Sequence, residues 1–256
     1  MHDRLTGRIR RPHEESDMRD GHRKIVVLGG SSGMGLATVR LLAEAGHALI
    51  ATGRDPARLA AALGPLAGDV RGEAFDAVDR TRLGAFFQRL GAFDDLVVAL
   101  SGGEGGGPFR QLDLGALERG FAAKFWPHVH AAQAALPTLR PGGSITFLTS
   151  ISARIANPGT AGLAAINGAI EAMVPVLARE LAPIRVNAVA PGVVDTPWWN
   201  AMGAEARAAV FRQQAETLPA GRVGRPEDVA EAVAFLVGNG FTTGTVVACD
   251  GGLHLL

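Results

Sequence analysis

The stretch KIVVLGGSSGMGLATVRLLAEAG, residues 24–46, decides the fold. Its first part, 24–30, is an apolar run ending in glycine, which predicts a buried strand, and 33–46 has the apolar spacing of a helix with a glycine stop. Glycines at 29, 33 and 35 lie around the turn between them. Glycine allows a tight turn and close backbone approach, and the free amides of a helix N-terminus attract a pyrophosphate. The stretch predicts the first strand, turn and helix of a dinucleotide-binding domain.

Outward from this stretch, short strand-like runs alternate with helical ones. Further strands are expected at 47–53, 94–100, 144–150, 184–190 and 245–250, with helical segments between most of them. Such alternation predicts crossover connections and a parallel sheet covered on both faces. We therefore expect an α/β fold: a single-domain, doubly wound Rossmann sheet over residues 24–256, with a lid at about 195–218. Residues 1–23 are expected to form a polar, flexible tail, and Met18 is an alternative start to Met1.

The apolar segment 159–181 carries a ridge of small residues at helical spacing, namely Gly162, Ala165, Ala169 and Ala172. Small residues let a second helix approach closely, which favours a subunit contact. Packing of the ridge against the protein's own sheet is an equally good interpretation.

The composition excludes several partners. Lys plus Arg and Asp plus Glu both number 25, so no general field favours nucleic acid. No apolar run approaches the roughly 18 residues needed to span a bilayer, and the N-terminus lacks the apolar core of a signal peptide. Cys249 is the only cysteine and is expected to be a buried strand residue. We expect a cytoplasmic protein that binds neither membranes nor nucleic acid.

The glycine spacing is GxxxGxG, and here the chain resembles the short-chain dehydrogenase/reductase family, whose usual form is TGxxxGxG; Leu28 stands at the threonine. The resemblance covers about residues 24–253, including FDAVD (75–79), RVNAVAPGVVDTPW (185–198), GRVGRPEDVAEAVAFL and TGTVVACDGG. It implies a homodimer or homotetramer. Together with the residue patterns, it implies that the cofactor is bound by Gly29, Ser31, Ser32, Gly33, Met34, Gly35, Arg54, Asp76, Ala77, Ser101, Asn167, Pro191, Gly192, Val194 and Thr196, with Asp76 beside the adenine.

Cofactor preference is indicated by ATGRD at the end of the second strand. An acidic side chain there would bind both ribose hydroxyls and repel a 2′-phosphate, whereas this chain has Gly53 and Arg54. A guanidinium can bind phosphate with two oriented bonds, so NADP(H) is favoured over NAD(H). The alternative is that Arg54 is a solvated surface charge. Asp55 is expected to cap the following helix.

The family's catalytic residues are a serine, a tyrosine, a lysine four residues after the tyrosine, and an asparagine. The resemblance makes Ser150 the serine. Thirteen residues later, where the family has YxxxK, the chain reads LAAIN, so Leu163 replaces the tyrosine and Asn167 the lysine. There is no tyrosine in the chain. Lys124, in FAAKFW, stands at the asparagine, as if lysine and asparagine had exchanged places.

We hypothesise that the Lys124 ammonium restores the lost positive charge and relays a proton, while Asn167 holds the ribose. Alternatively, Lys124 points to solvent or to a carboxylate at a subunit contact. Glu104, in the glycine-rich loop SGGEGGGPF (101–109), is interpreted as an exposed carboxylate rather than an acid of the site. His128 and His130 are interpreted as packing or interface residues, and no metal site is expected.

The lid carries Trp198, Trp199, Met202 and Phe211, which either cover an apolar substrate or pack the lid itself. Three functions remain open. The first is an NADP(H)-dependent oxidoreductase with altered proton handling, acting on an apolar small molecule such as an iminium ion or an activated alkene. The second is a catalytically silent NADP(H)-binding subunit or sensor. The third is a non-redox elimination or hydration on the same scaffold.

Overall fold

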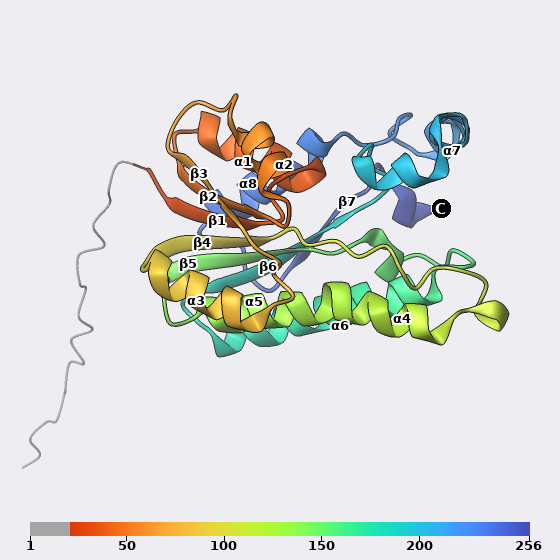
Figure 1. The fold of residues 1–256 in the computed structure, drawn as a ribbon. Helices are drawn as coiled ribbons and strands as arrows, with labels where there is room; N and C mark the ends of the chain where they lie inside the picture. Colours follow the sequence, from red (N-terminus) through yellow and green to blue (C-terminus); the bar gives the residue numbers. More distant parts are fainter. Residues whose placement is uncertain (1–20) are drawn as a thin grey trace, which may run out of the picture.

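A single parallel sheet organises residues 21–256, which are the part of the chain that the computed structural model describes (Figure 1). Its strand order is β3-β2-β1-β4-β5-β6-β7, so the order reverses between β1 and β4. The strands are β1 (Lys24–Leu28), β2 (Ala48–Gly53), β3 (Val70–Ala74), β4 (Phe93–Val98), β5 (Leu139–Leu148), β6 (Arg185–Pro191) and β7 (Val246–Cys249).

Helices cover both faces of this sheet (Figure 1). One face carries α1 (Gly33–Glu44), α2 (Pro56–Leu63) and α8 (Pro226–Gly238). The other carries α3 (Arg80–Leu90), α5 (Trp126–Ala135) and α6 (Ala161–Glu180). The remaining helical elements are η1 (Phe109–Gln111), α4 (Leu114–Gly120), the π-helical turn η2 (Phe121–Phe125), η3 (Ile151–Ala153), η4 (Pro197–Met202), α7 (Ala204–Thr217) and η5 (Leu253–Leu255).

Two hydrophobic cores follow from the alternation of side chains along the strands. On β1, Val26 and Leu28 belong to the core under α3, α5 and α6, whereas Ile25 and Val27 belong to the core under α1, α2 and α8. Because both faces of the sheet are covered, the central strands are apolar throughout. The predicted fold class, a doubly wound parallel sheet, is confirmed.

The sequence patterns missed β3 and misplaced the start of β5. β3 (VRGEA) is an edge strand with little burial, so it lacks an apolar pattern. β5 begins at Leu139, five residues before the predicted 144, because Leu139 already pairs with Phe93 ahead of a register shift. The other predicted strands agree within two residues. Most of the predicted tail, and the choice of Met1 or Met18 as the start, lie outside the described residues.

The small-residue ridge of α6 does not pack against the sheet. Ile170, Val174 and Ala178 make that contact, whereas Ala165 and Ala172 are exposed. Gly162 is buried, but against the loop after β4 at Gly105. The subunit contact at this ridge stays a prediction.

By length and composition alone α6 could cross a membrane, with a mean hydropathy of 1.6, so the statement that no apolar run approaches that size needs correction. One face of α6 packs on the sheet in the hydrophobic core, and about a third of its apolar window is buried (Figure 1).

Candidate active site

The glycine-rich turn lies at the carboxyl end of β1, where the strand order reverses. Gly29 has φ +87°, and a Cβ on it would lie 2.6 Å from the carbonyl oxygen of Ala99 at the end of β4. A Cβ on Gly35 would overlap the carbonyl oxygen of Gly29. Both positions therefore require glycine, and the turn is pulled tightly between β1, β4 and α1. Open parallel sheets bind their ligands at this kind of reversal.

The N-terminus of α1 is suited to receive an anion. Ser32 stands at the N-cap, but its side chain makes no capping hydrogen bond, and the first turn has no acidic residue. Gly33 has φ +52° and lies next to Thr196, which is at the base of the lid. The amides of the first turn and the helix dipole, next to Ser31, Ser32 and Met34, therefore have no competing carboxylate in that turn. A pyrophosphate fits these residues.

Arg54 is placed beside this turn by its neighbour Gly53. A Cβ on Gly53 would lie 2.9 Å from the side chain of Ser31, so glycine lets the end of β2 approach the glycine-rich turn. Arg54 itself is exposed. The Asp55 carboxylate accepts hydrogen bonds from the amides of Ala57 and Arg58, which confirms it as the cap of α2. Both hydrogen bonds are accepted by Oδ1 of this carboxylate.

The other predicted cofactor residues gather at the same edge of the sheet. Asp76 and Ala77 follow β3; Ala77 is buried, and the exposed Asp76 accepts a hydrogen bond from the amide of Val78. Ser101 is exposed beyond β4. The remaining residues follow or end β6: Pro191, Gly192, Val194 and Thr196. A Cβ on Gly192 would lie 2.7 Å from the Cα of Asp250, so this segment also requires glycine.

Ser150 stands just beyond the end of β5 and is partly exposed. Its hydroxyl oxygen accepts a hydrogen bond from the amide of Ser152 at 3.3 Å, which caps η3. The O–H itself is not consumed by that bond. The geometry therefore leaves Ser150 able to donate to a substrate oxygen.

Asn167 and Leu163 occupy successive turns of α6. The amide nitrogen of Asn167 donates to the carbonyl of Leu163 at 2.8 Å and to the hydroxyl of Ser152 at 3.3 Å, which fixes the orientation of the amide. Its Oδ1 is buried and has no partner among the described residues. A buried acceptor of this kind requires a donor. A ribose hydroxyl meets that requirement, so the residue fits a nicotinamide dinucleotide.

Lys124 lies in the π-helical turn η2 and points inward. Its ammonium donates to the carbonyl of Thr149, the residue before Ser150, at 3.1 Å. Burial lowers the pKa of Lys124 to about 8, and the charge of Glu171 opposes this shift. The interpretation of Lys124 as a solvent-facing lysine is therefore wrong. Rare π-helical turns occur often at functional sites.

Sequence reasoning missed Glu171 and Arg154. The Glu171 carboxylate accepts a hydrogen bond from the hydroxyl of Thr149 at 2.8 Å and another from Arg154 at 2.8 Å. Its side chain is only 10% exposed. The available signal was that Glu171 is the one charged residue between 161 and 178, in an otherwise apolar helix.

The loop after β4 closes one side of the site. A Cβ on Gly103 would lie 3.7 Å from Trp198 Nε1, and a Cβ on Gly106 would lie 3.7 Å from Leu163 Cδ1. The loop therefore runs between Trp198 of the lid and Leu163 of α6. Glu104 is an exposed carboxylate, as the sequence predicted, and it forms an ion pair with Arg119.

The two histidines pack as expected. His128 is fully buried, its Nδ1 donates to the carbonyl of Lys124 at 2.7 Å, and burial lowers its pKa to about 3. His130 stacks on Trp126. Among residues 21–256 no three His, Cys, Asp or Glu side chains are grouped so that they could hold a metal ion.

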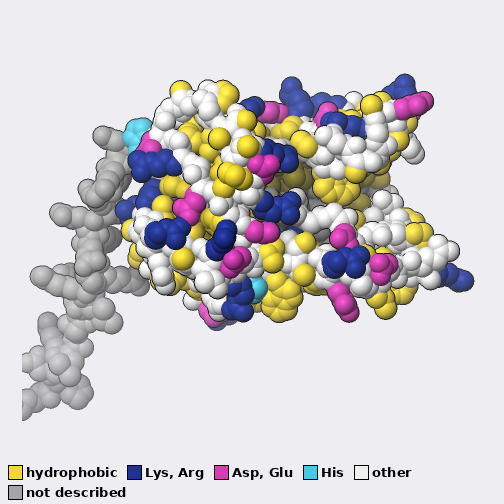
Figure 2. Space-filling view, viewed as in Figure 1, with side chains coloured by type: hydrophobic (Ala, Val, Ile, Leu, Met, Phe, Trp, Pro, Cys, Tyr) yellow, Lys and Arg dark blue, Asp and Glu magenta, His cyan; other side chains and the backbone are white. Residues whose placement is uncertain are grey.

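The apolar side chains of the lid differ in role: some pack the lid itself, and others are exposed and available to cover a substrate. Trp199 donates to the carbonyl of Val194 and contacts both Trp198 and Phe211, so it packs the lid itself. Trp198 and Met202 are 49% and 42% exposed. Figure 2 shows the surface hollowed between the lid and the opposite α4 region, with hydrophobic side chains along the hollow.

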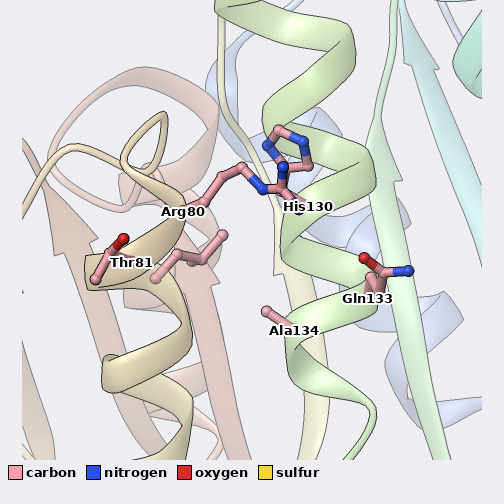
Figure 3. A pocket seen from close by; sticks show the side chains of 6 residues that line it. Arg80, Thr81, His130, Gln133 and Ala134 are labelled. Atoms are coloured by element: carbon pink, nitrogen blue, oxygen red, sulfur yellow. The ribbon is translucent and has the colours of Figure 1, made fainter.

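Two cavities lie elsewhere on the surface. One, of about 680 Å³, is lined by Pro108, Phe109, the segment 155–161 that follows η3, and Ala164. The other, of about 460 Å³, lies between α3 and α5, with Arg80 directed toward His130 (Figure 3). Neither cavity is lined by any of the predicted cofactor or catalytic residues. The first borders the turn of α6 that carries Leu163.

Comparison with known proteins agrees with this geometry. The family model described as enoyl-(acyl carrier protein) reductase matches residues 29–254. A cis-4-hydroxycyclohexanecarboxylate dehydrogenase of Sinomonas cyclohexanicum is 34% identical, covering 90% of this chain and 96% of that protein. A 1-cyclohexenylcarbonyl-CoA reductase of Streptomyces collinus is 30% identical, over 96% and 91%.

Two solved structures contain NADPH. A small-chain dehydrogenase in complex with NADPH has a TM-score of 0.80 at 33% identity, covering 92% of this chain and 100% of that chain. The NADPH-bound short-chain oxidoreductase of Pseudomonas aeruginosa PAO1, described as containing an atypical catalytic center, has a TM-score of 0.83 at 31% identity, over 90% and 96%. With the glycine turn, the strand order and these relatives together, the chain belongs to the short-chain dehydrogenase/reductase family of oxidoreductases.

Proposed function

We propose that this protein is an NADP(H)-dependent reductase of an apolar small molecule, in which a carbon–carbon double bond conjugated to a carbonyl is reduced. Lys124, rather than a tyrosine, is the source of the proton. The observation that carries the proposal is the pairing of an apolar Leu163 at the usual proton-donor position with a buried ammonium beside the peptide that precedes Ser150. Such a site stabilises negative charge but does not protonate an alkoxide directly.

The site residues divide the work as follows. NADPH, when bound, supplies a hydride. Ser150 donates its hydroxyl proton as a hydrogen bond to the substrate oxygen, on which negative charge develops as an enolate. Lys124 supplies positive charge beside the same peptide and, with a pKa of about 8, can release a proton for the α-carbon of the substrate near neutral pH. The same ammonium repels an iminium ion, which favours the activated alkene among the two candidate substrates.

Several observations support the cofactor and the substrate class. The glycine turn, Asn167 Oδ1 and Arg54 suit NADP(H), and two similar structures contain NADPH. The exposed Trp198 and Met202 of the lid offer apolar surface for a small substrate. One relative is named for the reduction of a cyclohexenylcarbonyl thioester.

The test is NADPH titration by fluorescence, followed by turnover with cyclic enones, enoyl thioesters, ketones and imines. Ser150→Ala serves as the control that removes the oxygen-binding hydroxyl, and Leu163→Tyr with Asn167→Lys restores the family pattern. We expect oxidation of NADPH with activated alkenes by the unmodified protein, and ketone reduction only in the restored variant. Binding of NADPH without turnover of any substrate would instead support the silent subunit, for which the apolar Leu163 is the favouring observation.

We also propose that the protein is a homodimer or homotetramer that acts in a reducing cytoplasm. The exposed small residues Ala165 and Ala172 on α6 offer a face for close helix contact, and Cys249 is the only cysteine. Light scattering on Ala165→Glu tests the assembly. A variant with the same mass as the unmodified protein would exclude this face.

A further inference from the structure

Two charged side chains bind Thr149, which is 4% exposed, and a third binds one of those two. Lys124 donates to its carbonyl oxygen at 3.1 Å, and its hydroxyl donates to Glu171 Oε1 at 2.8 Å. The second oxygen of Glu171 accepts from Arg154 Nε at 2.8 Å. The chain of contacts runs from η2 through the end of β5 to α6 and the segment after η3. It encloses the residue that immediately precedes Ser150.

This cluster has more positive than negative charge. Lys124 and Arg154 contribute two cations and Glu171 one anion. Among the groups that face Lys124, His128 on α5 is buried with its pKa lowered to about 3, so it is neutral near pH 7. The charged residues of α4, Glu118 and Arg119, are exposed on the helix surface.

Among the described residues, Glu171 is the one carboxylate whose charge acts on the Lys124 ammonium. The ammonium therefore depends on a single anion that it shares with Arg154.

We infer that Glu171 is a positioning residue: by binding Thr149 and Arg154 it holds the peptide that receives the Lys124 ammonium, and its charge keeps that ammonium protonated near neutral pH. The inference concerns the charge state of Lys124, and it rests on the proposed function only for its consequence in catalysis. Arg154 acts in the opposite sense, because it neutralises part of the Glu171 charge.

The opposite signs follow from elementary electrostatics. An anion near a cation favours the charged form, so removing Glu171 makes Lys124 lose its proton at lower pH. Removing Arg154 takes away the cation that neutralises part of the Glu171 charge, so Lys124 loses its proton at higher pH. A purely structural role for the cluster predicts no such pair of opposite shifts.

The chain provides an unusually direct way to measure this, because its only lysines are Lys24 and Lys124. Protein labelled with [¹³C]lysine gives two side-chain Cε signals, and the Lys24→Arg variant assigns them. Lys24 donates to the carbonyl of Leu90, far from the cluster in sequence and on another strand, so it is an internal control. Titration of the two signals by NMR requires neither turnover nor cofactor.

We expect Glu171→Gln to lower the titration midpoint of Lys124 by about one pH unit and Arg154→Met to raise it, with Lys24 unchanged in both. Glu180→Gln, at the end of the same helix, is the matched control and should leave both midpoints in place. Equal midpoints for Lys124 in the unmodified protein and both variants would overturn the inference. If Glu171→Gln does not fold, Glu171→Asp and Arg154→Met test the inference in its place. A fall of the Lys124 midpoint in Arg154→Met would overturn the inference, which predicts a rise.

Activity gives a second, separable result. If Lys124 supplies the proton, the alkaline limb of the kcat/KM profile moves with the NMR midpoint in each variant. A shifted midpoint with an unmoved pH profile would leave the role of Glu171 standing and reject the proposed role of Lys124 in catalysis.

Discussion

Replacing Lys124 with methionine is expected to stabilise the protein at neutral pH while impairing its function. The pKa of this lysine falls from 10.5 to about 8 because burial penalises the ammonium. At about 1.4 kcal/mol per pKa unit, the folded protein carries a charge penalty of about 3 kcal/mol at pH 7 relative to a neutral lysine. Methionine has a similar length and no charge, so Lys124→Met removes this penalty.

The pH dependence has a definite sign. The unfolded chain holds its proton up to about pH 10.5 and the folded chain only up to about pH 8. Between these values the unfolded state binds more protons, so the unfolding free energy of the unmodified protein rises with pH relative to that of the variant. The penalty is fully present below pH 8 and is relieved as the pH approaches 10.5, by about 2 to 3 kcal/mol between pH 7 and 10.

Urea denaturation of both proteins at pH 7, 8, 9 and 10, followed by circular dichroism, measures the difference. Lys24→Met is the matched control and should give a smaller pH-dependent difference, because burial lowers the pKa of Lys24 less than that of Lys124. A Lys124→Met protein that is less stable than the unmodified one at pH 7, or a difference that does not change with pH, would refute the reasoning.

Three further predictions concern the cofactor site and the acid limit of stability. Arg54→Ala should weaken NADPH binding about 10- to 100-fold and leave NADH binding nearly unchanged, as measured by fluorescence titration; equal losses for both would place Arg54 outside the phosphate site. Gly35→Ala should abolish NADPH binding or destabilise the fold, because its Cβ overlaps the Gly29 carbonyl, whereas the open Gly84→Ala should be tolerated in the same assay and in thermal melts. Asp228→Asn should cost about 1 kcal/mol at pH 7, since the bond to Arg222 lowers the pKa of Asp228 to about 2. That stability is present above the ordinary pKa of 3.8 and is lost as the pH falls towards 2, so the variant and the unmodified protein should converge in acid denaturation; a constant gap would contradict the assignment.

The cofactor half of the molecule could be predicted from sequence because its signals are local. Glycine at 29 and 35 is required by contacts within one strand–turn–helix unit, and Asp55 caps the helix that it precedes. The edge strand β3 was missed because an exposed strand has no apolar pattern to read.

The chemistry depends instead on contacts between distant segments. Lys124 meets Thr149 across 25 residues, and Glu171 meets Thr149 across 22. No spacing rule links these positions, because η2, β5 and α6 are brought together only by the packing of α5 and α6 on the sheet. Sequence placed Lys124 and Asn167 in the site by resemblance, but the partners that set their charge and orientation required the structure.

The π-helical turn at 121–125 also changes how this chain can be aligned with others. Such a turn accommodates one extra residue in a helix, and each residue of an α-helix advances by about 100°. The helical periodicity of α4 and that of α5 are therefore offset from each other by one residue. An alignment that extends α4 forward from Asp113 and one that extends α5 back from Ala135 differ by one residue in the turn between them. Equivalence between Lys124 and the asparagine of relatives therefore depends on where an alignment places the extra residue of this turn. We expect that deleting one residue within 121–125 would rotate the residues before the deletion by about 100° relative to those after it.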